Sequence, residues 1–200
     1  MMRNVATFML TVSLTAALAG CARSPRVTFY TLEPGAQVEA AEAAGAVPSV
    51  VVGPVTLPEL VDRPQLVVRV AANRVDILET HRWAEPLKSE LPRAIARDLG
   101  RLLGSNRVSS YLQHAGADAD YRVLVDFRRF ESSPGQAVTL EADWSLRRGA
   151  GGASKTGHYL AREPVLGDGY DPLMAAYGRA LFALSGDLAR AIRAETAPGR

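Results

Sequence analysis

The chain has 200 residues, with 23 Lys and Arg against 21 Asp and Glu, and therefore a formal net charge of +2. This near-neutral balance gives no electrostatic basis for binding nucleic acid, so we expect no nucleic-acid partner. A single cysteine excludes an intramolecular disulfide and a CxxC redox pair, and the 48% of hydrophobic residues suffices for one domain with a packed core.

The N-terminus has the layout of a secretory signal. Arg3 precedes an uncharged apolar stretch, Val5–Ala19, which is shorter than the roughly 20 residues of a membrane-spanning helix. Leu18-Ala19-Gly20-Cys21 closes the stretch with two small residues before the only cysteine, as in a bacterial lipobox. We predict a lipoprotein signal peptide at residues 1–20, acylation of Cys21 and a lipidated tether at residues 21–26. The alternative is an ordinary signal peptide with an incidental cysteine.

Acylation of Cys21 would anchor the mature chain to a membrane, because several acyl chains hold a protein far more firmly than one. Ala22 follows the cysteine at the position where aspartate commonly favours retention in the inner membrane. We therefore expect the lipid-anchored protein to be located at the periplasmic face of the outer membrane. Removal of the signal peptide takes away Arg3, so the mature chain has a formal net charge of 2 − 1 = +1.

The first half of the mature chain predicts strands. Val27–Leu32 is rich in β-branched and aromatic residues, whereas Glu33–Pro48 has the composition of a surface loop. The apolar run Ser49–Leu57 predicts a buried strand with a bulge or an edge position at Gly53-Pro54. Gln65–Val70 is then expected to pair with Val75–Leu78 as a hairpin.

Helical spacing of leucines and isoleucine over Pro86–Leu103 predicts an amphipathic helix that ends at Gly104. Pro92 conflicts with a helix interior because it lacks an N–H and crowds the preceding turn. We therefore expect a break near Ser89, with Ser89 capping the main helix and Pro92 in its first turn.

The second half predicts a strand at 107–112, a three-stranded meander and a closing helix. The meander strands begin near Tyr121, Val138 and Lys155, and Phe130 is out of phase with Tyr121 and Phe127, which predicts a bulge at Arg128-Arg129. In the middle strand, Val138, Leu140, Ala142, Trp144 and Leu146 share the apolar face. Asp171-Pro172 supplies an N-cap and an N1 proline for a helix that runs to about Ala194.

These elements predict an α+β fold, in which two amphipathic helices pack on one face of an antiparallel or mixed sheet, over residues 27–196. No GxSxG, HExxH, Walker or EF-hand pattern occurs in the sequence. His81, His114 and His158 lie in separate predicted elements, so we expect no metal, no cofactor beyond the lipid on Cys21, and no catalysis.

Two segments carry a family resemblance, Leu57–Arg69 with its Asp62-Arg63 pair between prolines, and Arg82-Trp83-Ala84-Glu85-Pro86-Leu87. Together with the opening Phe29-Tyr30-Thr31-Leu32, they resemble the paraquat-inducible protein C type lipoproteins, also called ABC-type transport auxiliary lipoproteins. The resemblance spans the mature chain. It implies an outer-membrane lipoprotein partner of mammalian-cell-entry (MCE) proteins, which carry lipids between the two membranes with an ABC transporter.

The same segments provide the candidate partner contacts, Asp62, Arg63, Arg82, Trp83 and Glu85. Asp62 and Arg63 either form a local ion pair, or Arg63 faces a carboxylate of the partner. Trp83 either packs in the core or anchors an interface.

Two other functional classes stay open, a periplasmic envelope-assembly or β-barrel-associated lipoprotein, and a lipid-active hydrolase. A homo-oligomer is also compatible with the sequence.

Overall fold

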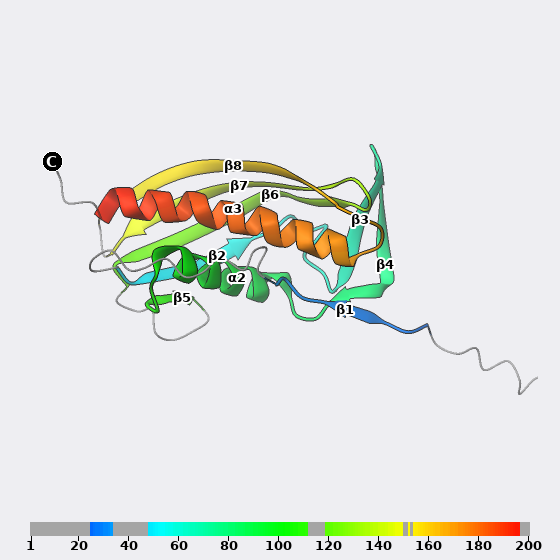
Figure 1. Cartoon of the computed structure of the whole chain (residues 1–200), viewed down its shortest axis with the longest axis horizontal. Coiled ribbons are helices and arrows are strands. Elements are labelled where there is room, and N and C mark those ends of the chain that lie inside the picture. The colour runs from blue at the N-terminus through cyan, green and yellow to red at the C-terminus, as the bar shows by residue number, and fades with distance from the viewer. Residues whose placement is uncertain (1–24, 34–47, 112–118, 150–151, 153, 197–200) are drawn as a thin grey trace, which may run out of the picture.

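A computed structural model of the chain describes residues 25–33, 48–111, 119–149, 152 and 154–196. Ten helices and strands lie within these residues, in an order close to the predicted one (Figure 1). They are β1 (Thr28–Tyr30), β2 (Val50–Thr56), β3 (Gln65–Ala71), β4 (Arg74–Trp83), α2 (Leu87–Leu103), β5 (Val108–Ser110), β6 (Tyr121–Ser133), β7 (Ala137–Arg148), β8 (Ser154–Pro164) and α3 (Asp171–Thr196).

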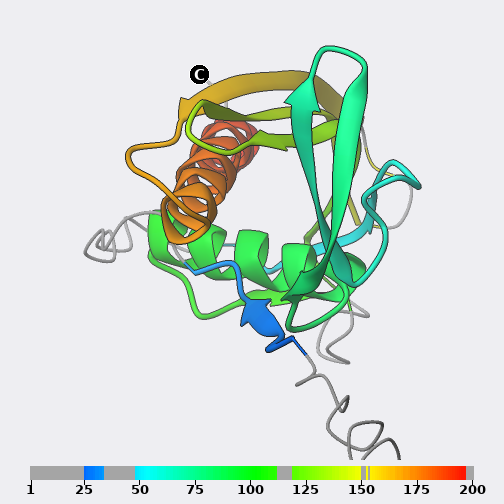
Figure 2. The ribbon, with the colours of Figure 1, turned by 90° about the vertical axis from the view of Figure 1, so that its right-hand side faces the viewer.

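The strands form two sheets, which confirms the α+β class but divides the expected sheet in two. The larger has the order β5-β2-β6-β7-β8, with β2 parallel to both neighbours and β6-β7-β8 as the antiparallel meander. The smaller has the order β1-β4-β3, and its β3–β4 hairpin stands at one end of the molecule (Figures 1 and 2). Strand β1 pairs in parallel with β4 and therefore belongs to the smaller sheet together with the hairpin.

Both helices lie on the same side of the five-stranded sheet (Figure 2). Helix α2 contacts β2 and β5, α3 contacts β7 and β8, and the helices also contact each other. Every second residue of β7 is buried against them, Trp144 at 9% exposure included. The apolar face predicted for this strand is therefore confirmed, and so is the half-solvated character of its other face.

An aromatic cluster joins the hairpin to the rest of the core. Trp83 of β4 meets Tyr177 of α3 edge to face at 5.7 Å, and Phe130 of β6 stacks on Tyr177 at 4.7 Å. All three side chains are at most 4% exposed. The two sheets consequently share one hydrophobic core, because α3 presents Tyr177 to both.

Two predicted irregularities are present. The register of β2 with β6 shifts between Val52 and Val55, at the Gly53-Pro54 pair. The register of β6 with β7 shifts between Phe127 and Arg129, and this extra residue returns Phe130 to the buried face. Both shifts are bulges that adjust which side chains enter the core.

The break expected near Ser89 is wrong. Helix α2 starts at Leu87, and the Glu90 N–H donates to the Pro86 carbonyl over 3.0 Å, so Pro86 is the N-cap and Pro92 lies inside the helix. Pro92 is buried there, and packing of the apolar face outweighs the lost hydrogen bond. The left-handed Gly104 ends the helix as predicted.

Helix α3 begins one residue earlier than the predicted cap implies. The Met174 N–H donates to the Tyr170 carbonyl over 2.9 Å, which places the cap at Tyr170 and Asp171 inside the first turn. The carboxylate of Asp171 still lies at the helix N-terminus, where the helix dipole favours negative charge.

Asp98 of α2 is a buried carboxyl, 1% exposed, whose Oδ1 accepts no hydrogen bond. Burial raises the pKa of Asp98, although the charges of Arg97 and Arg101 oppose the shift. A raised folded-state pKa means that its contribution to stability is present below the unfolded pKa and is lost as the pH rises through the folded value. We expect Asp98→Asn to be more stable than the wild type at pH 7, by on the order of 1 kcal/mol.

Urea unfolding of both proteins from pH 4 to pH 7 measures this difference. It should shrink as the pH falls through the raised pKa of Asp98, because the wild-type carboxyl then becomes protonated in the folded state. Asp62→Asn is the matched control, because that carboxylate is ion-paired at the surface. A pH-independent difference for Asp98→Asn would contradict a titrating buried carboxyl.

Candidate functional site

The loop between β2 and β3 is a compact turn that holds itself in place. The Val61 N–H donates to the Pro58 carbonyl over 3.0 Å, and the Asp62 N–H donates to the Glu59 backbone carbonyl over 3.3 Å. Val61 is 8% exposed and belongs to the core, whereas Leu60 beside it is 41% exposed. The turn thus buries one side chain as its anchor and leaves an apolar neighbour in solvent.

The local ion pair considered for Asp62 and Arg63 does not form. Asp62 pairs with Lys88 of α2, its Oδ2 lying 2.6 Å from Nζ, which connects the loop to the first turn of the helix. Arg63 is half-buried, and its Nε is inaccessible to water and has no hydrogen-bond acceptor. Arg63 also forms no ion pair among the described contacts, and its empty Nε is unusual because buried donors generally find a hydrogen-bond partner.

The second motif lies beside this loop. The Trp83 N–H donates to the Pro64 carbonyl over 2.8 Å, so the end of β4 and the end of the loop are hydrogen-bonded neighbours. Trp83 is 4% exposed, in agreement with the core alternative and not with an interface anchor. Arg82 donates to the Glu79 carbonyl over 2.9 Å, and Glu85 forms an ion pair with Arg93 of α2.

The five candidate contacts consequently have different positions. Asp62, Arg82 and Glu85 are engaged with neighbours on the same surface, and Trp83 is in the core. Arg63 alone of the five has an unsatisfied polar group. Sequence reasoning missed Leu60, because one leucine between prolines has no periodic pattern that would indicate exposure.

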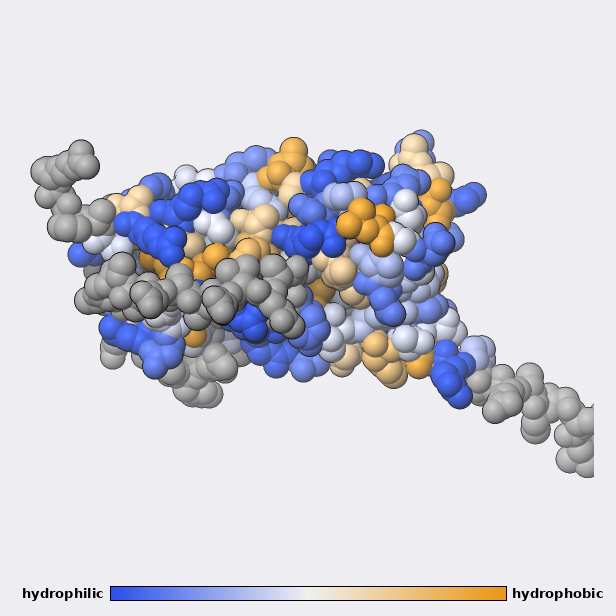
Figure 3. Space-filling view, viewed as in Figure 1, coloured by the Kyte–Doolittle hydropathy of each residue, from blue (hydrophilic) through white to orange (hydrophobic). Residues whose placement is uncertain are grey.

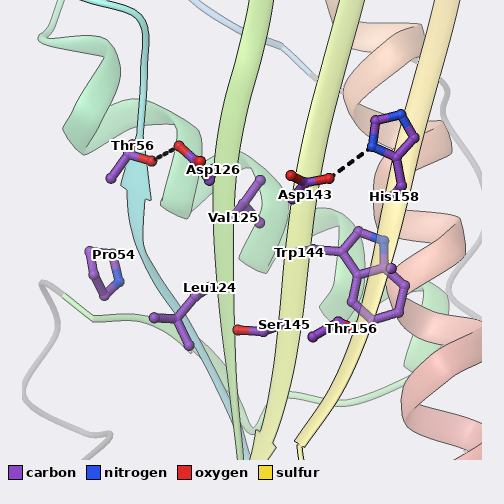
Figure 4. Close-up of a pocket in the computed structure, with 11 residues that line it drawn as sticks. Pro54, Thr56, Leu124, Val125, Asp126, Asp143, Trp144, Ser145, Thr156 and His158 are labelled. Atoms are coloured by element: carbon purple, nitrogen blue, oxygen red, sulfur yellow. Dashed lines mark hydrogen bonds and ion pairs between the residues drawn. The ribbon is translucent and has the colours of Figure 1, made fainter.

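The outer face of the five-stranded sheet, opposite the helices, carries an open groove of about 650 Å³ (Figure 4). Leu124, Ser145 and Thr156 lie along one part of it, and Asp126 and Asp143 along another (Figure 4). Both carboxylates already have partners within the domain. Thr56 donates to Asp126, and Asp143 contacts both His158, over 2.8 Å, and Arg128.

The hydrogen bond from His158, supported by Arg128, holds the pKa of Asp143 below its ordinary value. These contacts link adjacent strands on a solvated sheet face. They assemble no nucleophile with a base, and the described part of the chain contains no group of three His, Cys, Asp or Glu suited to a metal.

The two histidines that the structure describes lie in different elements, as predicted, and have different hydrogen-bond partners. His81 shares a hydrogen bond of 2.8 Å with the Tyr30 hydroxyl, and His158 contacts Asp143. His114 and Cys21 fall outside the described residues. None of the helices in the described ranges is long and apolar enough to cross a membrane.

The fold and the site define a class, an α+β domain with a helix pair on one sheet face and a braced loop that presents an apolar and a cationic side chain. Residues 30–189 match the family of ABC-type transport auxiliary lipoprotein components, and the chain belongs to that family. The resemblance inferred from its motifs is confirmed.

Solved structures share the fold. A structure of an uncharacterised protein has a TM-score of 0.68 and 19% identity, and the match covers 84% of this chain and 99% of the other. A protein of the DUF330 family from Xanthomonas campestris has a TM-score of 0.64 and 19% identity, with 82% and 93% covered. No curated protein matches the sequence.

Proposed function

We propose that this auxiliary lipoprotein is a non-enzymatic, outer-membrane accessory subunit of an MCE-type ABC system for intermembrane lipid transport. It acts by binding the periplasmic end of an MCE protein. Membership in the auxiliary family supports the link to ABC transport. The observation that carries the mode of action is the loop at residues 58–64, which holds Arg63 without an acceptor beside the exposed Leu60.

The loop suits a protein partner for a physical reason. Its backbone is fixed by the hydrogen bonds of Val61 and Asp62 and by the Asp62–Lys88 ion pair, so little conformational entropy is lost on binding. A partner carboxylate would form an ion pair with the guanidinium of Arg63, which has no ion pair among the described contacts, and apolar contact at Leu60 would exclude water around that pair. We therefore assign Arg63 and Leu60 as the central contacts, with Arg82 and Glu85 at the rim.

The anchor at Cys21 supports the location. Val27 is only six positions after Cys21, which limits the tether to about 20 Å when it is extended. The domain then stays beside the outer membrane, where a conduit from the inner membrane has to end.

Charge reversal at Arg63 tests the proposal. We expect Arg63→Glu to reduce co-purification of the MCE protein after crosslinking in intact cells by at least tenfold, because it places a carboxylate against the partner's carboxylate. Arg63→Met, which keeps the packing of the side-chain stem and removes only the charge, should weaken capture less.

Arg74→Glu is the matched control, since Arg74 is an exposed arginine with no ion pair among the described contacts and lies at the tip of the β3–β4 hairpin. Its capture and melting temperature should equal those of the wild type. A fall in melting temperature for Arg63→Met with unchanged capture would assign Arg63 to the fold. If the wild-type protein captures no MCE protein, the transport proposal is wrong and an envelope-assembly role takes precedence.

A further inference from the structure

Strand β1 and the residue just before it expose two apolar side chains, Phe29 and Val27. Phe29 is 63% exposed, and Val27, two residues earlier, is 38% exposed. Tyr30, which follows Phe29, is buried. Hydrophobic surface is visible where β1 meets the chain that leads to the N-terminus (Figure 3).

The domain holds Phe29 in this outward position. The Ala84 N–H donates to the Tyr30 carbonyl over 2.8 Å, and the Tyr30 hydroxyl shares a hydrogen bond of 2.8 Å with His81. At the other end of the segment, the Leu32 N–H donates to Glu90 over 2.6 Å, and Arg97 donates to the Leu32 carbonyl over 3.0 Å. The exposure of Phe29 is therefore a property of the fold rather than of a loose terminus.

The same strand is the part of the fold nearest the lipid anchor along the chain. Phe29 is eight residues from Cys21, so an extended connection places it within about 26 Å of the acylated sulfur. The acyl chains lie in the bilayer, and the tether brings this corner of the domain to the headgroup region before any other.

We propose that Val27 and Phe29 contact the phospholipid bilayer and that this contact orients the domain on the membrane. The proposal rests on the acylation of Cys21 that the proposed function includes. An aromatic ring at the headgroup level is a favourable membrane contact, and burial of Phe29 there removes the largest exposed aromatic surface of the described residues from water.

The charges near Phe29 define the kind of membrane. Arg26 precedes the strand, but Glu33 and Asp171 line the cleft of about 400 Å³ that Phe29 borders, together with the apolar Met174 and Ala175. One cation stands against two carboxylates, so the local charge does not favour anionic lipid and the apolar contact dominates. The interaction should therefore occur on zwitterionic phosphatidylcholine and should change little with anionic lipid.

Depth-dependent fluorescence quenching tests the contact. The mature lipidated Phe29→Trp protein is reconstituted into phosphatidylcholine vesicles that contain lipids with a nitroxide near the carbonyl groups. We expect at least half of the additional emission, relative to wild type, to be quenched, because Trp83 and Trp144 are buried and contribute a constant background.

Leu160→Trp is the matched control, since Leu160 is 61% exposed on β8 of the five-stranded sheet. Its additional emission should stay unquenched. Equal quenching at both positions would overturn a defined orientation, and absence of quenching at position 29 would overturn the contact. Quenching that is absent while the emission at position 29 shifts to the blue with protein concentration would assign this face to a second copy of the chain, which also overturns the proposal.

The two proposals fail separately. Capture of the MCE protein by detergent-solubilised lipoprotein requires no bilayer, whereas quenching requires no MCE protein. Loss of capture with quenching intact would overturn the proposed function alone, and the reverse result would overturn the membrane contact alone.

Discussion

Trp144→Ala is expected to destabilise the domain by about 3–5 kcal/mol, the cost of truncating a large aromatic side chain in a core. Trp144 lies on the buried face of β7, in the row with Leu140, Ala142 and Leu146. Its indole covers Gly157 of β8, where an added Cβ would overlap the ring. The truncation therefore leaves a cavity that the glycine opposite cannot fill.

Thermal melting followed by circular dichroism measures the loss, which should lower the midpoint by roughly 10 °C for a domain of this size. Trp144→Phe is the control. It keeps an aromatic ring and removes only Nε1, which is buried without an acceptor, so it should cost clearly less than the alanine variant. An unchanged midpoint for Trp144→Ala would contradict the packing of β7 against the helices.

The contact with Gly157 gives a second readout of the same packing. Gly157→Ala alone should destabilise the domain by about 1–3 kcal/mol, because its methyl group meets the indole. Combined with Trp144→Ala, the methyl group has space, and the double variant should lose less stability than the sum of the two single variants. Additive losses would show that the two residues do not contact each other.

Cys21→Ala is expected to remove the protein from the membrane fraction almost completely. Cys21 carries the only thiol in the sequence and is the predicted site of acylation, and among the described residues no helix is able to span a membrane. The apolar contact of Val27 and Phe29 is too small to hold the protein without acyl chains, since even a single myristoyl chain binds only marginally.

Envelope fractionation with detection of acylation checks this result. Ser24→Ala, in the same tether but without a thiol, should remain acylated and membrane-bound. The melting temperature of the Cys21→Ala domain should equal that of the wild type, because the first buried residue that the structure describes is Tyr30, nine positions further along the chain. Recovery of Cys21→Ala in the membrane at the wild-type level would show that another anchor exists.

The elements with strong periodicity were predictable from sequence. The alternation in β7 identified its buried face because side chains of a strand alternate strictly, and Phe130 revealed the bulge of β6 because it breaks that alternation. The start of α2 was not predictable from local rules. Pro92 indicates a break by its missing N–H, but burial of Pro92, Leu91 and Ile95 outweighs that local cost.

The candidate site was predictable only in part. Its two motifs were found because prolines, an acid and a base stand out in an apolar strand region. Only the structure shows, by the hydrogen bond between Trp83 and Pro64, that the two motifs are neighbours. The partner of Asp62 was not predictable, because Lys88 lies 26 residues further along the chain and reaches the loop only when α2 is folded.

The sequence by itself determined the family, the α+β class and the predicted anchor at Cys21, since these depend on motifs and periodicities that are local in the chain. Only the tertiary structure decided that the strands divide into two sheets and that Trp83 belongs to the core. It also decided that Arg63 has no acceptor and that Phe29 faces solvent. The physical reason is that pairing partners and exposure depend on contacts between residues far apart in sequence, such as β1 with β4 and Trp83 with Tyr177.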